Sequence, residues 1–538
     1  MTVVEEEFGD TDRAIAGWFT GYRRAAVPVL AVTAIAVIVL LANWAIVPTG
    51  SQPIGSVAVL RFANISGDET LDYFSDGLGE GLIDSLSQLP ALNVIASTSS
   101  FQYRGQEIDP RQVGRALGVE AIVAGRVLRR GGGLEVRVEL VAAAARAQLW
   151  GKTYERNNTE LHAVQEDIAR SIAGKLRPPL TAEQRRRLTK RATGNEQAYR
   201  LYLIGLFQAR KHTGDGLKKA LDYYSQAVAI DPNFALAFAA MTPVYSNLAN
   251  TGQLDPREAV ARGKAAALKA LEIDPELAQA HSSIAHTKRN EWDWPEAERE
   301  FQRAIELNPN LAGVHSGYSI LLTILGRTGE ALAANGRAQE LDPLRISFKA
   351  NEGGILAAAR RFDEALPVLH DAIKMEPGYA FSHLSLGHVY LGKGMYAESI
   401  NEDQAASRIF GAAVNSLIDF GYVYAKSGKR KEAIAILNQL RSGKQYVSPA
   451  GLAILYAGLS DREAALGSLE LAFVQRDPQI QNIHAEPRFD SLRAEPRFQA
   501  LFAPPFPRPV EVYSRRRPVS VEHPARRNRL LTVVWRGR

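Results

Sequence analysis

Few residues of this 538-residue sequence have the types and spacing of a catalytic site. The tripeptide Asp419-Phe420-Gly421 matches the metal-binding motif of protein kinases. Kinase chemistry also needs a glycine-rich phosphate loop, a strand lysine and a catalytic-loop aspartate upstream, and the sequence does not contain these in order. We therefore interpret the tripeptide as part of a helix and expect no phosphoryl transfer.

Two pairs of histidines are the next candidates, because imidazole nitrogens bind metals. The pairs are His281 with His286 and His383 with His388, and the members of each pair are five residues apart. Ligands on one helical face are usually three or four residues apart. The chain also has no cysteine and lacks the phosphate-loop, nucleophile-elbow and dinucleotide-binding motifs. We therefore expect no metal site and no cofactor.

The segment between Asn64 and Gly77 is rich in acids and serines, which are residue types that catalysis uses. We expect Asp76 at the N-cap or in the first turn of a helix, where a carboxylate accepts hydrogen bonds from backbone N–H groups. Gly67 is expected in a turn, where a flexible backbone is needed. This interpretation predicts that the chain is not an enzyme, and an unfamiliar catalytic arrangement is the alternative.

The net charge of +6 is concentrated near the carboxyl end. From Arg508 onward nine arginines stand against Glu511 and Glu522, a net of +7, so the rest of the chain carries about −1. The basic residues therefore belong to a tail and do not indicate a folded surface that reads nucleic acid. We expect a solvated, flexible tail, with binding to nucleic acid or anionic lipid as the alternative.

Residues 25–47 form an uncharged apolar stretch, and about 20 such residues span a bilayer as a helix. The sequence therefore predicts one transmembrane helix. Arg23 and Arg24 precede it, whereas the next positive residue is Arg61, so the positive-inside rule places the short head in the cytoplasm. We expect a single-pass protein of the inner membrane with its carboxyl-terminal domains in the periplasm. A buried core helix, a cleaved signal peptide and a cytoplasmic location of these domains are the alternatives.

Strand and helix patterns alternate between residues 54 and 177. The expected elements are strands at 56–62, 92–96, 121–128, 134–141 and 149–154 and helices at 73–89, 110–117 and 159–176. The segments VAVLRFANISGDETLDYFSDGLGEGL and IDPRQVGRALGVEAIVAGRVLRRGGGLEVRVELV resemble the TolB-like domain of bacterial membrane regulators. The resemblance implies an α/β fold and no known reaction.

Acid or amide residues followed by proline recur further along the chain. The last four of these prolines are 34 residues apart, at Pro275, Pro309, Pro343 and Pro377. This is the tetratricopeptide period, in which each repeat is a helix pair and proline ends the second helix. A generic alanine-rich helical bundle, the alternative, has no reason to keep this phase. Because Pro232 lies 43 residues before Pro275, we expect a longer loop near 248–255.

Tetratricopeptide arrays bind peptides or proteins on a concave surface lined by their first helices. The resemblance to this family implies that in the repeat starting near Ala278 the groove residues are Gln279, Ser282, His286 and Arg289. In the repeat starting near Ala380 it implies Phe381, Leu384 and His388. We expect a protein or peptide partner and no nucleic acid. The sequence does not specify an oligomeric state.

The order of a membrane helix, a TolB-like domain and tetratricopeptide repeats resembles the sensory half of CadC-type activators and of class III adenylate cyclase-type regulators. Only 24 residues precede the predicted helix, so we expect the output domain of these regulators to be missing. The predicted function is a membrane-anchored interaction scaffold or sensor acting through its repeats. The alternative is a sensory subunit of a signalling system whose enzyme or regulator is encoded separately.

The expected fold class is an α/β TolB-like domain followed by an all-α tetratricopeptide-repeat solenoid, with one transmembrane helix. The expected domains are a cytoplasmic head at 1–24, the transmembrane helix at 25–47, the TolB-like domain at 54–177, a basic linker at 178–194, the repeat array at 195–480, a C-terminal cap at 481–503 and a disordered basic tail at 504–538.

Overall fold

The computed structural model describes residues 54–502 apart from short gaps. The gaps are residues 69–70, 90, 104–108, 131–132, 158–160, 177–179, 189–190, 212, 251–252, 411–413, 444–446, 476, 478–479, 481–482 and 484–485. The predicted cytoplasmic head, membrane helix and basic tail therefore lie outside the described residues.

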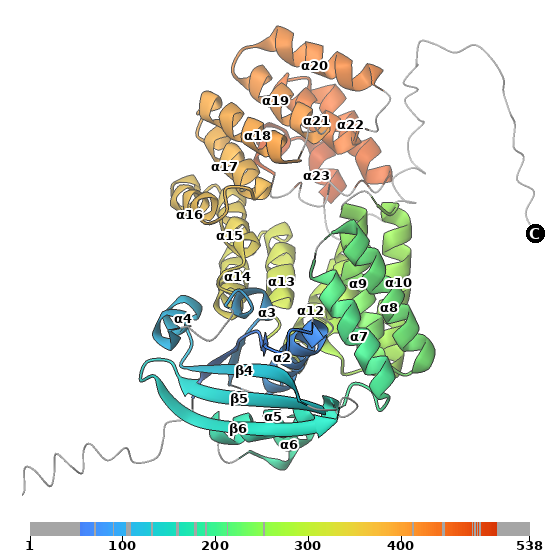
Figure 1. Cartoon of the computed structure of the whole chain (residues 1–538). Helices are drawn as coiled ribbons and strands as arrows, with labels where there is room; N and C mark the ends of the chain where they lie inside the picture. The colour runs from blue at the N-terminus through green and yellow to red at the C-terminus, as the bar shows by residue number, and fades with distance from the viewer. Residues whose placement is uncertain are drawn as a thin grey trace, which may run out of the picture. The chain divides into compact units, whose positions relative to one another are not determined.

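A mixed β-sheet forms the first described part of the chain (Figure 1). Its strands are β1 (Ser56–Val59), β2 (Ala63–Asn64), β3 (Asn93–Ile95), β4 (Ala121–Arg130), β5 (Gly133–Ala142) and β6 (Ala147–Asn157). The order across the sheet is β3-β1-β4-β5-β6, and β2 also pairs with β4. The pairs of β1 with β3 and β4 are parallel, whereas β4, β5 and β6 form an antiparallel meander.

Helices cover both faces of β1, because alternate residues of a strand point to opposite sides. The helices of this region are α2 (Asp72–Ser87), α3 (Ser97–Ser100), α4 (Pro110–Leu117), α5 (Leu161–Leu176) and α6 (Ala182–Leu188). Val57 and Val59 belong to an apolar cluster with Leu82 of α2. Ala58 belongs to a second cluster with Val113 of α4. The chain therefore builds a strand that is buried on both sides.

Most elements expected before residue 177 are present, with ends shifted by a few residues. Helix α4 has the expected bounds because Asp109 caps it and Pro110 starts it. Gly67 has a φ of 73°, as a turn glycine should. The expectation for Asp76 was wrong. It lies inside α2, where its buried carboxylate pairs with Arg61 and, across 3.2 Å, with Arg210.

Helix pairs follow one another from α7 to α22 (Figure 1). The first helices of the pairs are α7 (Glu196–Ala209), α9 (Ala235–Asn250), α11 (Ala278–Asn290), α13 (Ala312–Ile324), α15 (Ile346–Ala358), α17 (Ala380–Gly392), α19 (Val414–Lys426) and α21 (Pro449–Gly458). The second helices are α8 (Gly214–Ile230), α10 (Pro256–Ile273), α12 (Trp294–Leu307), α14 (Thr328–Leu341), α16 (Phe362–Met375), α18 (Tyr396–Phe410), α20 (Arg430–Ser442) and α22 (Arg462–Val474).

The predicted 34-residue phase is present in these helices. From α11 to α19 the first helices begin at residues 278, 312, 346, 380 and 414, each 34 residues after the last. The longer interval before α11 has mainly a different cause from the one expected. Helices α9 and α10 have 16 and 18 residues, whereas α11 and α12 have 13 and 14, so seven of the nine extra residues lengthen helices and two lengthen the connection at 251–255.

The residue before each repeated proline ends a second helix. Asp231, Asp274, Asn308, Asp342 and Glu376 are the C-caps of α8, α10, α12, α14 and α16. Proline disfavours helical geometry at the residue before it, so the chain leaves the helix at the same place in each repeat. In three of these turns the cap side chain also accepts a hydrogen bond from the backbone N–H two residues later.

Two of these turns also hold the α/β domain against the array. The buried Asn310 amide donates to the carbonyl oxygens of Ser87, at 3.0 Å, and Leu92, at 2.9 Å, and its oxygen accepts from the Val94 N–H. In the next turn Asp342 accepts a 2.5 Å hydrogen bond from the Ser99 hydroxyl. The α/β domain and the repeats are therefore joined by buried polar contacts at the proline turns.

The expectation of a transmembrane helix, and of an inner-membrane location with it, is not supported and is corrected here. In the part of the chain that the structure describes, no helix is both long enough and apolar enough to cross a bilayer. The apolar helix α21 has 10 residues, about half of a bilayer-spanning length, and packs in the protein core. Residues 25–47 are not among those described. The supported fold class is a mostly α-helical repeat solenoid, preceded by the mixed sheet.

The buried amide contacts predict a large effect of replacing Asn310. We expect Asn310→Ala to lower the free energy of unfolding by roughly 2–4 kcal/mol, because buried backbone groups of Leu92 and Val94 lose their partner. Asn233→Ala changes the equivalent residue of an earlier turn, where the side chain is exposed, and should cost less than about 0.5 kcal/mol. Urea unfolding followed by circular dichroism measures both, and equal midpoints would contradict the docking role.

Candidate partner-binding surface

The inner face of the array is formed by the first helices. Contacts between successive first helices recur, from α9 with α11 and α11 with α13 to α15 with α17 and α19 with α21. Repeat solenoids curve in this way around the helices that lie closest together. The residues predicted for binding lie on two of these helices, α11 and α17.

On α11 the four predicted residues differ in their surroundings. Gln279 and Ser282 are half-buried. The ring of His286 meets Phe301 edge-on, with the centroids 5.1 Å apart, and lies against Gly317, where a Cβ would approach it to 2.6 Å. Burial and the charge of Arg289 lower the pKa of His286 to about 3, so the ring is neutral. His286 thus packs between helices, and its contact with a partner stays a prediction.

Arg289 is a half-buried cation near the end of α11. Its Nη1 atom is buried and has no hydrogen-bond partner among the described residues. Burial lowers its pKa to about 10, which leaves the guanidinium charged at neutral pH.

On α17 the predicted residues run from exposed to enclosed along the helix. Phe381, at the start, is 54% exposed. Leu384 is half-buried one turn later, and His388 lies 4.0 Å from Asp419 of α19. Phe381 is therefore the accessible apolar side chain of this set.

The other histidines of the two sequence pairs have a structural role. Nε2 of His281 pairs with the Pro275 carbonyl at 2.9 Å, and Nδ1 pairs with Glu300 at 2.6 Å. His383 pairs in the same way with Pro377 and Glu402, 102 residues later. Each of these two histidines thus connects a proline turn to the second helix of its repeat. This shared role explains why a histidine recurs at this position of the two repeats.

The segment after α22 folds back onto the inner face. It consists of the 3₁₀-helix η3 (Pro487–Leu492) and α23 (Pro496–Phe502), and we call residues 486–502 the cap. Arg488 of the cap is held by Glu486, at 2.8 and 2.9 Å, and by Asp419 of α19. Tyr422 of α19 donates to the Arg488 carbonyl, and Arg360 at the end of α15 pairs with Asp490.

The cap contains the sequence Glu-Pro-Arg-Phe twice, and the two copies have different surroundings. Phe489 and Phe498 are both buried, with their rings 6.3 Å apart. Arg488 of the first copy is nearly buried between carboxylates of the cap and the inner face. Arg497 of the second copy pairs with Glu463 and Glu470 on α22 and is a third exposed. Only the first copy places its arginine on the first helices.

The site around Arg488 is rich in carboxylates. Burial by itself would raise the pKa of Asp419, but the charges and hydrogen bonds of Arg488 and His388 together lower that pKa overall. Asp403 of α18 is 2% exposed, and its Oδ1 atom has no hydrogen-bond partner among the described residues. Burial and the charge of Asp419 raise the pKa of Asp403 to about 7. Burial would lower the pKa of His388, but Asp419 and Glu486 raise it overall.

Glycine is required beside this carboxylate. A Cβ at Gly387 of α17 would lie 2.6 Å from Oδ1 of Asp403. The small residue that the repeat pattern predicts at this position, Gly387, therefore leaves room for the carboxyl group of Asp403 beside α17.

A separate cleft of about 830 Å³ lies between the α/β domain and the first repeats. Gln279 is among its lining residues, together with His162 and Tyr199, whose rings stack at 3.8 Å. Asp84 of α2 also lines it, and burial together with the charge of Glu80 raises its pKa to about 7. The predicted contact Gln279 thus borders this cleft.

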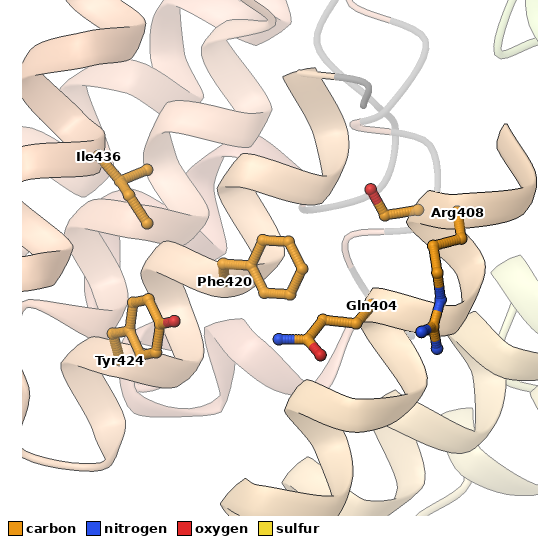
Figure 2. A pocket seen from close by; sticks show the side chains of 6 residues that line it. Gln404, Arg408, Phe420, Tyr424 and Ile436 are labelled. Carbon is orange, nitrogen blue, oxygen red and sulfur yellow. The ribbon is translucent and has the colours of Figure 1, made fainter. Parts of the chain in front are cut away.

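A second hollow of about 450 Å³ lies among α18, α19 and α20. In Figure 2 the ring of Phe420 has Gln404 and Arg408 on one side and Tyr424 and Ile436 on the other. Phe420 belongs to the kinase-like tripeptide, whose Asp419 instead binds Arg488 and whose Gly421 packs against Leu455. Each residue of the tripeptide therefore has a role in the array.

Sequence comparisons find relatives that match parts of the chain. It is 30% identical over 231 residues to a protein of Rhizobium meliloti (strain 1021) named putative adenylate cyclase 3, covering 43% of this chain and 39% of the relative. It is 28% identical over 147 residues to the transcriptional regulator HilA of Salmonella typhimurium, covering 27% of each chain. It is 36% identical over 69 residues to the TPR repeat-containing thioredoxin TTL4 of Arabidopsis thaliana, covering 13% of this chain and 10% of the relative.

The chain spans 39% or less of the length of these three curated relatives. No family model matches it. Among solved structures, a Pseudomonas aeruginosa pilF structure aligns with 38% of this chain and 90% of that chain, at 20% identity and a TM-score of 0.31. In the Cut9–Hcn1 structure of APC/C the alignment covers 62% of this chain and 65% of that chain, at 15% identity and a TM-score of 0.39.

The phased helix pairs define the array as a tetratricopeptide-repeat fold. The chain is a repeat protein related in sequence to a protein named putative adenylate cyclase and to a tetratricopeptide repeat protein.

The carboxylates around Arg488 predict a pH dependence of stability. The pKa of Asp403 is higher in the folded chain than the usual value of about 3.9, so the folded state binds more protons and stability falls as pH rises from about 4 to 7. Asp403→Asn removes this ionisation. We expect the variant to be roughly 1–3 kcal/mol more stable than the original chain at pH 8, and to differ little at pH 4.

Urea unfolding at several pH values measures this difference. Asp371→Asn, which changes an exposed helical aspartate of α16, serves as the matched control and should leave the pH dependence unchanged. Parallel pH profiles for Asp403→Asn and the original chain would refute the assignment.

Proposed function

We propose that this chain is a non-enzymatic interaction protein whose repeat array binds a protein or peptide on the inner face of its first helices. One observation carries the proposal. The inner face already holds a short segment of the chain itself, through the ion pair of Arg488 with Asp419 and the burial of Phe489. A surface that binds a peptide in this way has the chemistry that peptide recognition requires.

The accessible part of this face begins at Phe381. Large aromatic side chains contribute strongly to protein interfaces when a partner buries them. Phe381 is 54% exposed on a first helix, and Leu384 lies one turn further along the same helix. These two residues are the partner contacts that we favour among the seven predicted from the sequence.

A role in signalling is the second candidate. Two of the partial relatives are named as an adenylate cyclase and a transcriptional regulator, which are classes of signalling protein. We propose that the chain supplies a regulatory module to such a system, and that its α/β domain, which resembles a TolB-like domain in sequence, is part of that module. The identity of the bound partner separates this candidate from a general scaffold.

Site-specific photocrosslinking in cells that make the protein tests both candidates. A photoreactive phenylalanine derivative at Phe381 is expected to crosslink to a discrete partner protein. The same derivative at Leu268, which is 51% exposed on the second helix α10, is the matched control and should give no such product. Identical products at both positions would contradict binding on the inner face. A partner with a cyclase, kinase or DNA-binding domain would favour the signalling role.

A further inference from the structure

We propose that His388, Asp403 and Asp419 form a receptor for a segment in which arginine is followed by an aromatic residue, and that the cap occupies it until another protein presents such a segment. This proposal deepens the proposed function and rests on it. It assigns the kind of partner and the place where the partner docks.

The charges of the receptor lead to this partner chemistry. The array contributes the carboxyl groups of Asp403 and Asp419, and the nearest array cation to Asp419 in the described residues is His388, at 4.0 Å. Buried carboxylates are costly unless they are paired. The cation that pairs with Asp419 comes from outside the helix pairs, as Arg488 of the cap. The receptor is therefore electrostatically incomplete without an arginine supplied by another segment.

The geometry favours arginine over lysine. Three guanidinium nitrogens of Arg488 are used at once, two toward Glu486 of the bound segment itself and one toward Asp419 of the receptor. A planar guanidinium can bind a carboxylate of its own segment and one of the receptor at the same time, whereas an ammonium acts as a point charge. The hydroxyl of Tyr422 donates to the Arg488 carbonyl at 3.4 Å, so the backbone of the bound segment is contacted as well.

The residue after the arginine supplies the apolar contact. Phe489 is 2% exposed and belongs to the same apolar cluster as Ile418 of α19 and Leu455 of α21. The arginine and the aromatic ring thus enter neighbouring places on successive first helices. A segment lacking either residue loses one of the two contacts.

The cap competes with a partner because it is tethered to the receptor. A tethered segment has an effective concentration of the order of millimolar, so it weakens the apparent affinity of any competing segment. The ion pair of Asp490 with Arg360 is one of the contacts that hold the cap, together with the buried side chains of Phe489 and Phe498. A covalent link at this contact should keep the cap on the receptor, whereas a competing segment can displace an unlinked cap.

The absence of cysteine in the sequence makes this testable in the full chain. In Arg360→Cys/Asp490→Cys, a short bis-maleimide reagent links the cap to the array, and N-ethylmaleimide leaves it unlinked. The probe is a fluorescent peptide of residues 484–493, measured by anisotropy. We expect the unlinked protein to bind the probe at least about tenfold more tightly than the linked protein.

Three controls make the result specific. Linking Arg462→Cys/Glu495→Cys fixes the second Glu-Pro-Arg-Phe copy to α22 and should not change probe binding. Replacing the arginine of the probe by alanine, or introducing Asp419→Asn into the unlinked protein, should each weaken binding at least about tenfold. Circular dichroism of the linked and unlinked forms of one variant checks that both are folded.

Equal binding to the linked and unlinked forms, or equal binding of the arginine-free probe, would overturn the proposal. Dimers of the unlinked protein that disappear on linking would overturn it in favour of a second copy of this chain as the occupant. If either result is obtained while a photoreactive residue at Phe381 still crosslinks to a partner protein, the proposed function stands. If Phe381 gives no crosslink to a partner, the proposed function itself is refuted.

Discussion

The proline turns between repeats are the constraint on which the rest of the structure depends. Each proline forces the residue before it out of helical geometry, so the five second helices α8, α10, α12, α14 and α16 end at the same point and the next first helix begins three residues after the proline. In the turns at Asn308–Asn310 and Asp342–Leu344, the polar residues that flank proline also bind the α/β domain. A slip of one residue in either helix would break the repeat phase and the domain contact together.

A buried ion pair has the corresponding role at the other end of the array. Arg488 and the carboxylates around it are nearly buried, and removing one member leaves the others with an unpaired charge in a poorly solvated place. The cap therefore cannot be treated as a passive cover of the last apolar helices. It completes the electrostatics of the inner face, which is the same face on which a tetratricopeptide array binds its partners.

Local patterns in the sequence were sufficient for most elements and for the repeat phase, although they did not predict α3 and α6. Helix α4 follows from Asp109 and Pro110, and the 34-residue phase follows from recurring prolines, because these signals act within a few residues of the chain. Asp76 was misassigned because α2 begins at Asp72, which is the acid of its first turn, whereas Asp76 pairs with Arg61 and with Arg210, 134 residues away. The expected membrane helix has no support in the described residues, and hydropathy alone cannot report how a segment packs.

By itself, the sequence determined the approximate extent of most helices, which residues are small, and which sequence motifs recur. Those properties depend on backbone geometry and on side-chain size, which are local. Only the tertiary structure decided that His388 joins Asp403, Asp419 and Arg488 in one cluster, whereas His286 packs behind Phe301. Both histidines occupy the same position in their repeats, so periodicity could not separate them. The physical difference is that the cap folds back over His388, whereas His286 packs against Phe301. The position of the cap depends on contacts between residues far apart in sequence.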